Sequence, residues 1–326
     1  MSAVGILGVG AHLPGHLIDN DQIQTWTGAT PQWVRERTGI LGRRYAAEGT
    51  VTSDMAVAAA ADLLAADPLI RERIDLIVLA TSTPDQPQPA TAAVVQHKLG
   101  LSGMPAFDVN AVCSGFIYAL ATAAGILGDS DRLGLVIGAD MYSTIMNRDD
   151  HRTVSLFGDG AGAVLLGQVP QGYGFQAIRL TTDGAYRELV EVVAGGTRER
   201  VTAEAVAAGR DLFTMDGRAV REYAMAAVPK VVAEALDASA LDVDDIDRVI
   251  VHQGNVRLVE SLAAELGVSM DRVPMTAAEF GNTGAASIPV TLAKAHAERP
   301  FERGERVVLA AVGGGMTAGA CVLIWH

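Results

Sequence analysis

Short apolar runs alternate along this chain with longer stretches in which apolar positions recur at a helical period. The short runs are rich in Val, Ile and Leu, which favours buried strands. The longer stretches are rich in alanine, which favours helices. Strands are predicted in the first half at residues 4–9, 75–80, 106–109, 133–138 and 161–166. Helices are predicted there at residues 54–66, 90–99 and 115–127.

The second half repeats this alternation of strands and helices. Helices are predicted at residues 220–235, 256–266 and 285–297. Strands are predicted at residues 247–251, 306–312 and 320–325. Alternating strands and helices are typical of an α/β protein in which helices pack on sheets.

The two halves are also similar in sequence near their ends. The segment GAGAVLL at residues 160–166 resembles the segment TAGACVL at residues 317–323. We therefore predict two pseudo-repeated halves, residues 1–170 and residues 171–326. Chance similarity between strand-rich segments is the alternative interpretation.

Residues 184–214 differ from the rest of the chain in their weak periodicity and mixed charge. Long irregular segments within compact domains are often functional. We predict that this segment forms an elaborated surface region over the functional site.

Composition and charge narrow the class of protein further. The chain has 326 residues and is 49% hydrophobic, which is enough for one large domain or two closely packed halves. Its formal net charge of −13 argues against a dedicated nucleic-acid-binding protein, which needs a basic face. Two cysteines make no disulfide framework and fit a reducing cytoplasm. With no export signal and no run of roughly 20 apolar residues, we expect a cytoplasmic protein that does not enter a membrane.

A cysteine between a predicted strand and a predicted helix is the first candidate for chemistry. Residues 107–120 read FDVNAVCSGFIYAL, so Cys113 lies at the turn before an apolar helix. The positive end of a helix dipole and free backbone N–H groups there lower the pKa of a thiol. Small neighbours leave room for a substrate, so Cys113 is a candidate nucleophile. A buried structural cysteine is the alternative.

Three further motifs offer groups that would complement such a nucleophile. His252 follows a strand directly and enters a Gln-Gly-Asn turn, although a lone histidine is more often structural. Asn282 lies among small residues before a helix, where it could also serve as a helix cap. The glycine run at residues 313–315 would let backbone N–H groups approach a substrate, as an oxyanion hole requires. Together they suggest Cys/His/Asn chemistry.

Two other functional classes fit the sequence less well. Gly8 and Gly10 follow a strand, but Leu13 and Pro14 stand where a dinucleotide-binding fingerprint needs a third glycine and the opening of a helix. Papain-like proteases share the Cys, His and Asn residue types, but their local pattern around the cysteine is absent. We expect no metal site and no permanently bound cofactor.

At this point the motifs resemble those of the β-ketoacyl-ACP synthase III family of decarboxylating condensing enzymes. The similarity runs nearly from end to end of the chain. The motifs that carry it are WVRERTGI at residues 33–40, FDV…CSGF at 107–116, FGDGAGA at 157–163, HQGN at 252–255, GNTGAAS at 281–287 and GGGMTAG at 313–319.

The resemblance implies a fold, an activity and roles for the candidate residues. The fold is thiolase-like, with two pseudo-repeated halves in five α-β-α-β-α layers, and the protein is a homodimer. Cys113 takes an acyl group from acyl-CoA. His252 and Asn282 hold a malonyl thioester, supplied as malonyl-acyl carrier protein, and stabilise the charge that forms on decarboxylation. The backbone N–H groups of Cys113 and Gly314 form the oxyanion hole.

The resemblance also implies a coenzyme A site and an acyl pocket. By position, the residues implied in binding coenzyme A or its pantetheine arm are Trp33, Arg37, Gly217, Asn255 and Arg257. His151, with Arg152 next to it, replaces an arginine that often stacks on the adenine in the family. Gln88 replaces a bulky apolar residue of the acyl pocket that crosses the dimer in some members, which makes an ordinary acetyl starter less assured.

The resulting function is an acyl-CoA-primed decarboxylative Claisen condensation that starts fatty-acid or polyketide chains. One alternative is a relative that transfers an acyl group to an alcohol, amine or carrier protein without decarboxylation. A second alternative is a non-catalytic partner subunit of a heterodimeric synthase. Intact Cys113, His252 and Asn282 disfavour both alternatives.

Overall fold

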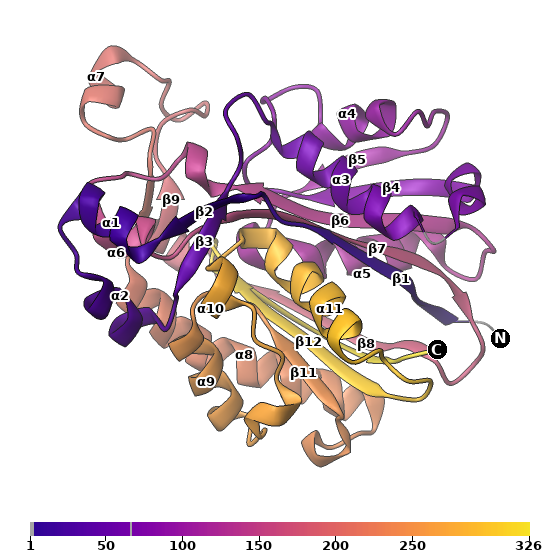
Figure 1. Ribbon diagram of the computed structural model, residues 1–326. Helices are drawn as coiled ribbons and strands as arrows, with labels where there is room; N and C mark the ends of the chain where they lie inside the picture. The colour runs from indigo at the N-terminus through magenta and orange to yellow at the C-terminus, as the bar shows by residue number, and fades with distance from the viewer. Residues whose placement is uncertain (1–2, 66) are drawn as a thin grey trace.

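The computed structural model describes residues 3–65 and 67–326 and is built around two sheets (Figure 1). The first sheet has the strand order β1-β7-β6-β4-β5, in which β4 is parallel to both β5 and β6, while β7 is antiparallel to β6 and β1. Its strands are β1 (Ala3–His12), β4 (Ile74–Ala80), β5 (Ala106–Val109), β6 (Leu133–Met141) and β7 (Asp159–Val169).

The second sheet lies below the first in Figure 1 and has the strand order β11-β12-β13-β8. β11 is parallel to β12, and the other neighbours are antiparallel. Its strands are β8 (Gly174–Thr182), β11 (Arg248–Val251), β12 (Arg306–Gly313) and β13 (Thr317–Ile324). β7 ends the first sheet's share of the chain at Val169, and β8 begins at Gly174 in the second sheet. The predicted boundary between two halves near residue 170 stays a prediction.

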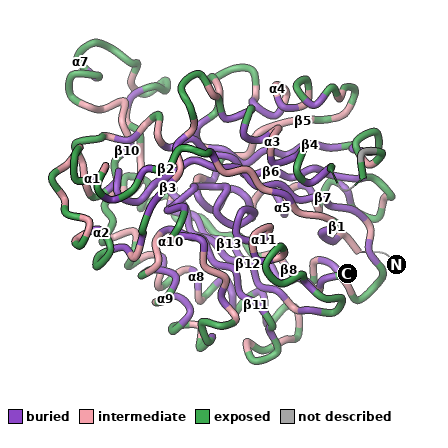
Figure 2. The backbone as a smooth tube through the Cα atoms, viewed as in Figure 1, coloured by how far each residue is buried: buried purple, intermediate pink, exposed green. Residues whose placement is uncertain are grey.

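Helices form three layers around the two sheets, which gives the five-layered arrangement that the family resemblance implied. The middle layer holds α5 (Gly115–Leu127) and α11 (Ser287–Glu298), whose apolar side chains pack against strands of both sheets. The outer layers are α3 (Thr52–Leu64) with α4 (Thr91–Lys98) on the first sheet, and α8 (Gly217–Ser239) with α9 (Val256–Glu265) on the second. The inner strands β6, β7, β12 and β13 are buried, whereas Figure 2 shows β1 and β8 as partly exposed.

Smaller elements gather at one end of the layers, at the left of Figure 1. They include two two-stranded sheets, one formed by β2 with β3 and the other by β9 with β10. Their strands are β2 (His16–Asp19), β3 (Gly42–Tyr45), β9 (Val190–Val192) and β10 (Phe213–Met215). The helices there are α1 (Asn20–Thr27), α2 (Pro31–Thr38), α6 (His151–Val154), α7 (Ala203–Ala207) and α10 (Ala277–Phe280).

The predicted strands and helices of the two layered halves are all present. The predicted helix at 54–66 extends onto residue 66, which lies outside the described residues; α3 itself begins two residues earlier, at Thr52. β8 was not predicted because its outer half is exposed and its sequence alternates weakly. Among the described residues, no helix is both long and apolar enough to cross a membrane.

The layered arrangement brings the carboxyl ends of several strands close together. β5 runs into the turn that holds Cys113, β11 runs into His252, and β12 ends at Gly313. β5 belongs to the first sheet, whereas β11 and β12 belong to the second. The ends of strands from both sheets therefore present the candidate residues to one cavity.

Candidate active site

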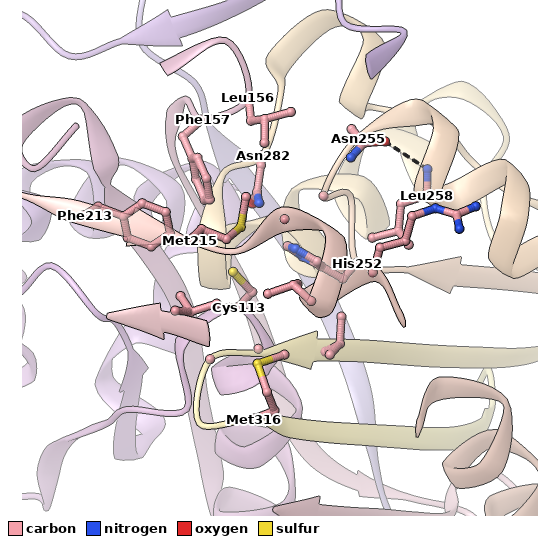
Figure 3. A pocket seen from close by; sticks show the side chains of 18 residues that line it. Cys113, Leu156, Phe157, Phe213, Met215, His252, Asn255, Leu258, Asn282 and Met316 are labelled. Atoms are coloured by element: carbon pink, nitrogen blue, oxygen red, sulfur yellow. Dashed lines mark hydrogen bonds between the residues drawn. The ribbon is translucent and has the colours of Figure 1, made fainter. Parts of the chain in front are cut away.

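Cys113, His252 and Asn282 line a single cavity of about 130 Å³. Figure 3 shows their side chains pointing into the same space from three separate parts of the chain. Gly313 and Gly314 form another part of its wall. The rest of the wall is mainly apolar and includes Leu156, Phe157, Val190, Phe213, Met215 and Met316. Val190 and Phe213 lie within residues 184–214, and Met215 follows directly. This segment therefore forms part of the cavity wall.

Cys113 lies in a 3-10 turn, Val112–Ser114, directly before α5. Val112 has a φ of 49°, a left-handed conformation that is uncommon for a β-branched residue and marks a constrained turn. The Ser114 hydroxyl donates to the Ala111 carbonyl at 2.9 Å, and Ser114 Oγ lies 2.7 Å from Thr317 Oγ1. These contacts fasten the turn to the start of β13 and fix the direction of the thiol.

The pKa of the Cys113 thiol corrects one expectation from the sequence. Burial and the nearby negative charge of Asp140 raise this pKa to about 12, although hydrogen bonding from Tyr142 and Asn282 partly opposes the rise. The thiol at the start of a helix is therefore protonated at neutral pH in the closed cavity. Desolvation outweighs the helix dipole here because the cysteine is almost fully removed from water.

Gly313, the last residue of β12, and Gly314 after it allow the backbone to approach this turn closely. A side-chain carbon at Gly313 would lie 2.5 Å from the Ala111 carbonyl oxygen and 3.0 Å from the Cys113 nitrogen, so only glycine fits. Gly314 follows on the cavity wall beside Cys113. The structure thus brings together the two residues whose N–H groups we predicted to form an oxyanion hole.

His252 is buried, and its imidazole makes one short polar contact. Nδ1 lies 2.6 Å from the hydroxyl oxygen of Ser287, at the first residue of α11. Burial lowers the pKa of His252 to about 4, so the ring is neutral near pH 7. A Ser287 hydroxyl that donates to Nδ1 leaves the ring proton on Nε2, where it can donate to a bound group.

Asn282 is held so that its amide nitrogen is free to act in the cavity. Its side-chain oxygen accepts a hydrogen bond from the Gly284 N–H at 2.9 Å. Its backbone N–H donates to the Leu156 carbonyl at 2.8 Å, and its carbonyl accepts from the Gly158 N–H. Because the amide oxygen is engaged, the NH₂ group points toward Cys113, as Figure 3 shows.

The residues expected to bind coenzyme A fall into two groups. Gly217, at the start of α8, and Asn255 lie on the cavity wall. The Asn255 side-chain oxygen caps α9 by accepting from the Leu258 N–H at 2.9 Å. Trp33 and His151 lie outside the cavity lining but contact each other edge to face, with ring centroids 4.9 Å apart. The structure thus pairs the two side chains expected to hold the adenine.

The charged residues expected near coenzyme A lie on the surface. Arg37 is exposed on α2, and Arg152 pairs with Asp150 at 2.9 Å. Arg257 pairs with Glu260 at 3.0 Å and donates to the Glu36 carbonyl of α2 at 3.4 Å. Arg221 of α8 reaches the cavity wall itself and was not selected from the sequence.

Gln88 lies apart from the cavity within the single chain. Its side chain is exposed, and it precedes a cis peptide bond to Pro89. The position expected to reach the acyl pocket therefore does so only if it comes from a second copy of the chain.

Three residues near the cavity were missed from the sequence. Ser287 contacts His252, Tyr142 contributes to the environment of the Cys113 thiol, and Asp140 is fully buried near Cys113 and Tyr142. Ser287 is the last residue of the GNTGAAS motif, which also contains Asn282. The motif gave no indication that Ser287 contacts His252. Among the described residues, no group of three or more His, Cys, Asp or Glu side chains is arranged to hold a metal ion.

Comparisons with known proteins place these residues in a family. The family model described as 3-oxoacyl-[acyl-carrier-protein (ACP)] synthase III matches residues 107–184, and the model of its C-terminal part matches residues 236–325. The acetoacetyl CoA synthase NphT7 of Streptomyces sp. (strain CL190) is 42% identical over 322 residues, covering 98% of each protein. A β-ketoacyl-[acyl-carrier-protein] synthase III of Rhodospirillum centenum is 43% identical over 325 residues, again covering 98% of each.

Solved structures agree with this assignment. The 3-oxoacyl-(acyl carrier protein) synthase III, FabH, of Pseudomonas aeruginosa PAO1 has a TM-score of 0.90 at 34% identity, covering 99% of this chain and 98% of that one. The priming β-ketosynthase of the R1128 polyketide pathway has a TM-score of 0.91 at 28% identity, with coverages of 99% and 96%. The fold is thiolase-like, and the chain belongs to the β-ketoacyl-[acyl-carrier-protein] synthase III family.

Proposed function

We propose that the protein catalyses an acyl-CoA-primed decarboxylative condensation with a malonyl thioester, which yields a β-ketoacyl thioester. The observation that carries this proposal is the convergence of Cys113, His252 and Asn282 on one buried cavity. A thiol supplies a nucleophile, and two neutral N–H donors supply the means to stabilise a negative oxygen.

The first half-reaction transfers the acyl group to Cys113. The sulfur attacks the thioester carbonyl carbon, the bond from that carbon to the coenzyme A sulfur breaks, and the thiol proton ends on coenzyme A. Negative charge gathers on the carbonyl oxygen, which the backbone N–H groups of Cys113 and Gly314 are proposed to bind. Their shared place on the cavity wall supports this role.

The second half-reaction uses the two neutral donors. The bond from the malonyl methylene carbon to its carboxylate breaks, carbon dioxide leaves, and the electron pair forms an enolate. His252 Nε2–H and the Asn282 NH₂ group are proposed to donate to the enolate oxygen. The enolate carbon then attacks the acyl carbonyl, and the Cys113 sulfur leaves and regains a proton from solvent. A His252 that stays neutral can donate without losing its proton.

Coenzyme A is proposed to reach the cavity past α2 and α9. The Trp33–His151 pair lies on α2 and α6, and α6 leads directly to the wall residues Leu156 and Phe157. We assign Arg37, Arg152 and Arg257 to the nucleotide or to the carrier protein, and Gly217 and Asn255 to the pantetheine arm. The relative NphT7 is named an acetoacetyl CoA synthase, which supports testing malonyl-CoA beside malonyl-acyl carrier protein as extender.

A homodimer is part of the same proposal. β5 is an edge strand of the first sheet and is only half-buried in the single chain, so its unpaired backbone groups can join a second copy. Gln88 lies in the exposed loop before α4 and is proposed to complete the partner's acyl pocket. Both cysteines are free and buried, which supports a reducing cytoplasm as the place of action.

The experiment that tests the proposal is acylation followed by mass spectrometry. The protein is incubated with acetyl-CoA, hexanoyl-CoA and a carboxylated acyl-CoA, and the mass added to each cysteine peptide is measured. We expect an adduct on Cys113 that is absent in Cys113→Ala and present in Cys321→Ser. An adduct that survives in Cys113→Ala would refute the proposed nucleophile.

A further inference from the structure

Asp140 is a fully buried carboxylate at the end of β6, and it lies between two loops of the site. One carboxylate oxygen accepts hydrogen bonds from the Ser82 and Thr83 N–H groups at 2.7 and 3.2 Å, and from the Thr81, Ser82 and Thr83 hydroxyls at 3.1 Å each. The other oxygen accepts from the Ala285 N–H at 2.7 Å. Burying a charge is costly unless such donors surround it, so these contacts hold both loops to β6.

The Ala285 contact acts on Asn282 through the residue before Ala285. This residue is Gly284, and its N–H donates to the Asn282 side-chain oxygen at 2.9 Å. Gly284 has a φ of 58°, and a side-chain carbon there would lie 2.2 Å from Asp140 Oδ2 and 2.5 Å from the Tyr142 ring. The turn therefore rests directly on the carboxylate, and it keeps that position only while residue 284 is glycine.

We propose that Asp140 is a positioning residue whose carboxylate holds the Gly284–Ala285 turn and thereby directs the Asn282 NH₂ group at the reacting atoms. This inference rests on the proposed function, because it assigns a cause to the orientation of a group that acts in decarboxylation. The carboxylate touches neither the thioester nor the enolate in this account, and it acts on decarboxylation through the turn.

A second series of contacts runs from Asp140 toward Cys113. Ser82 Oγ, which donates to Asp140, lies 3.1 Å from the Tyr142 hydroxyl. The Tyr142 ring stacks on Phe157 with centroids 4.4 Å apart, and Phe157 lines the cavity together with Cys113. Cys113 and Tyr142 are the titratable groups that face Asp140. We therefore expect a change of charge at residue 140 to shift the pKa of Cys113.

Asp140→Asn tests the role with little change of shape. The amide oxygen would remain with the several donors of residues 81–83, which places its NH₂ group against the Ala285 N–H and breaks that contact. We expect malonyl decarboxylation to fall on the order of 10²-fold, as for the loss of one oxyanion donor, while acylation of Cys113 changes much less. Gly284→Ala leaves the carboxylate in place but pushes the turn away from it. We therefore expect this variant, too, to lose more decarboxylation than acylation.

Glu305→Gln is the matched control for a general loss of stability. Glu305 is also a buried carboxylate, paired with Arg248, and it precedes β12 at the end opposite Gly313. We expect it to affect both half-reactions equally. Equal losses in Asp140→Asn, or wild-type decarboxylation in that variant, would overturn the inference.

Alkylation of Cys113 by iodoacetamide gives a readout that does not depend on the reaction. Removing the negative charge of Asp140 favours the thiolate, so the pH profile of alkylation in Asp140→Asn is expected to shift to lower pH. An unchanged profile together with wild-type decarboxylation in Asp140→Asn would overturn the inference. Absence of decarboxylation in the wild type would instead remove the proposed function, so the two failures are distinguishable.

Discussion

The Ser287 hydroxyl contacts Nδ1 of His252, and when it donates there the ring proton stays on Nε2; Ser287→Ala removes this contact. In the neutral ring, either nitrogen can carry the proton. The Ser287 hydroxyl, 2.6 Å from Nδ1, favours the form with the proton on Nε2. A hydrogen bond of this kind contributes about 0.5–1.5 kcal/mol, and its loss leaves a buried acceptor without a partner. Without it, the ring can place its proton on Nδ1 and turn a lone pair toward the enolate.

The size of the effect follows from these values. A shift of about 1.4 kcal/mol in the tautomer balance corresponds to about tenfold in rate. Complete loss of one donor to a negative oxygen would cost about 10²–10³ in rate. We therefore expect decarboxylation of a malonyl thioester by Ser287→Ala to fall about tenfold, with 10³ as the upper limit. Acylation of Cys113 should keep its rate, because the proposed oxyanion donors of that step are backbone N–H groups.

The assay measures carbon dioxide release from the malonyl thioester and the rate of acyl adduct formation on the same preparation. Ser155→Ala is the matched control, because Ser155 is equally buried and its hydroxyl has no hydrogen-bond partner among the described residues. It should leave both rates unchanged. If Ser287→Ala releases carbon dioxide at the wild-type rate, the proposed tautomer control is wrong.

Further predictions concern stability and pH. Gly162→Ala should lower the free energy of unfolding by about 1–3 kcal/mol, because the added side-chain carbon would lie 2.6 Å from the Val290 nitrogen. Gly125→Ala lies in an open part of α5 and should raise the free energy of unfolding by about 0.5–1 kcal/mol. A comparison of Tm with the wild type checks both. The unfolded state binds a proton to His252 at its ordinary pKa of 6.5, whereas the folded state does so only near pH 4. This contribution of about 3 kcal/mol is present above pH 6.5 and lost as pH falls toward 4, and urea titrations of wild type and His252→Gln should differ in that slope. Alkylation of Cys113 should rise steadily from pH 7 to 10 without a plateau, and a plateau near neutral pH would contradict the raised pKa.

Local patterns were sufficient to predict the layered part of the fold. The strands at 75–80 and 106–109 and the helix at 115–127 match β4, β5 and α5 closely, because buried strands and apolar helices impose strong periodicities. The weakly alternating β8 escaped prediction, since one end of it is exposed. Cys113 and His252 were selected because each follows a predicted strand, and the structure places both on one cavity wall.

The supporting contacts of the site could not be predicted in the same way. Asp140 looks like an ordinary residue at the end of a strand, and only its distance to Ala285, 145 residues away, reveals its position between two loops. The raised pKa of Cys113 has the same origin, since desolvation depends on the whole packed structure and not on the local helix. Gln88 marks a further limit, because its side chain is exposed in the single chain and its place in the pocket of a second copy stays a prediction.

The central claim is that one cavity joins acyl transfer to decarboxylation, and the stoichiometry of a single reaction tests it directly. The wild-type protein is incubated with acyl-CoA and a malonyl thioester, either malonyl-CoA or malonyl-acyl carrier protein, and carbon dioxide and β-ketoacyl thioester are both quantified. We predict one carbon dioxide for each β-ketoacyl thioester, with both products lost in Cys113→Ala. Transfer of the acyl group to an alcohol, amine or carrier protein without release of carbon dioxide would contradict the account.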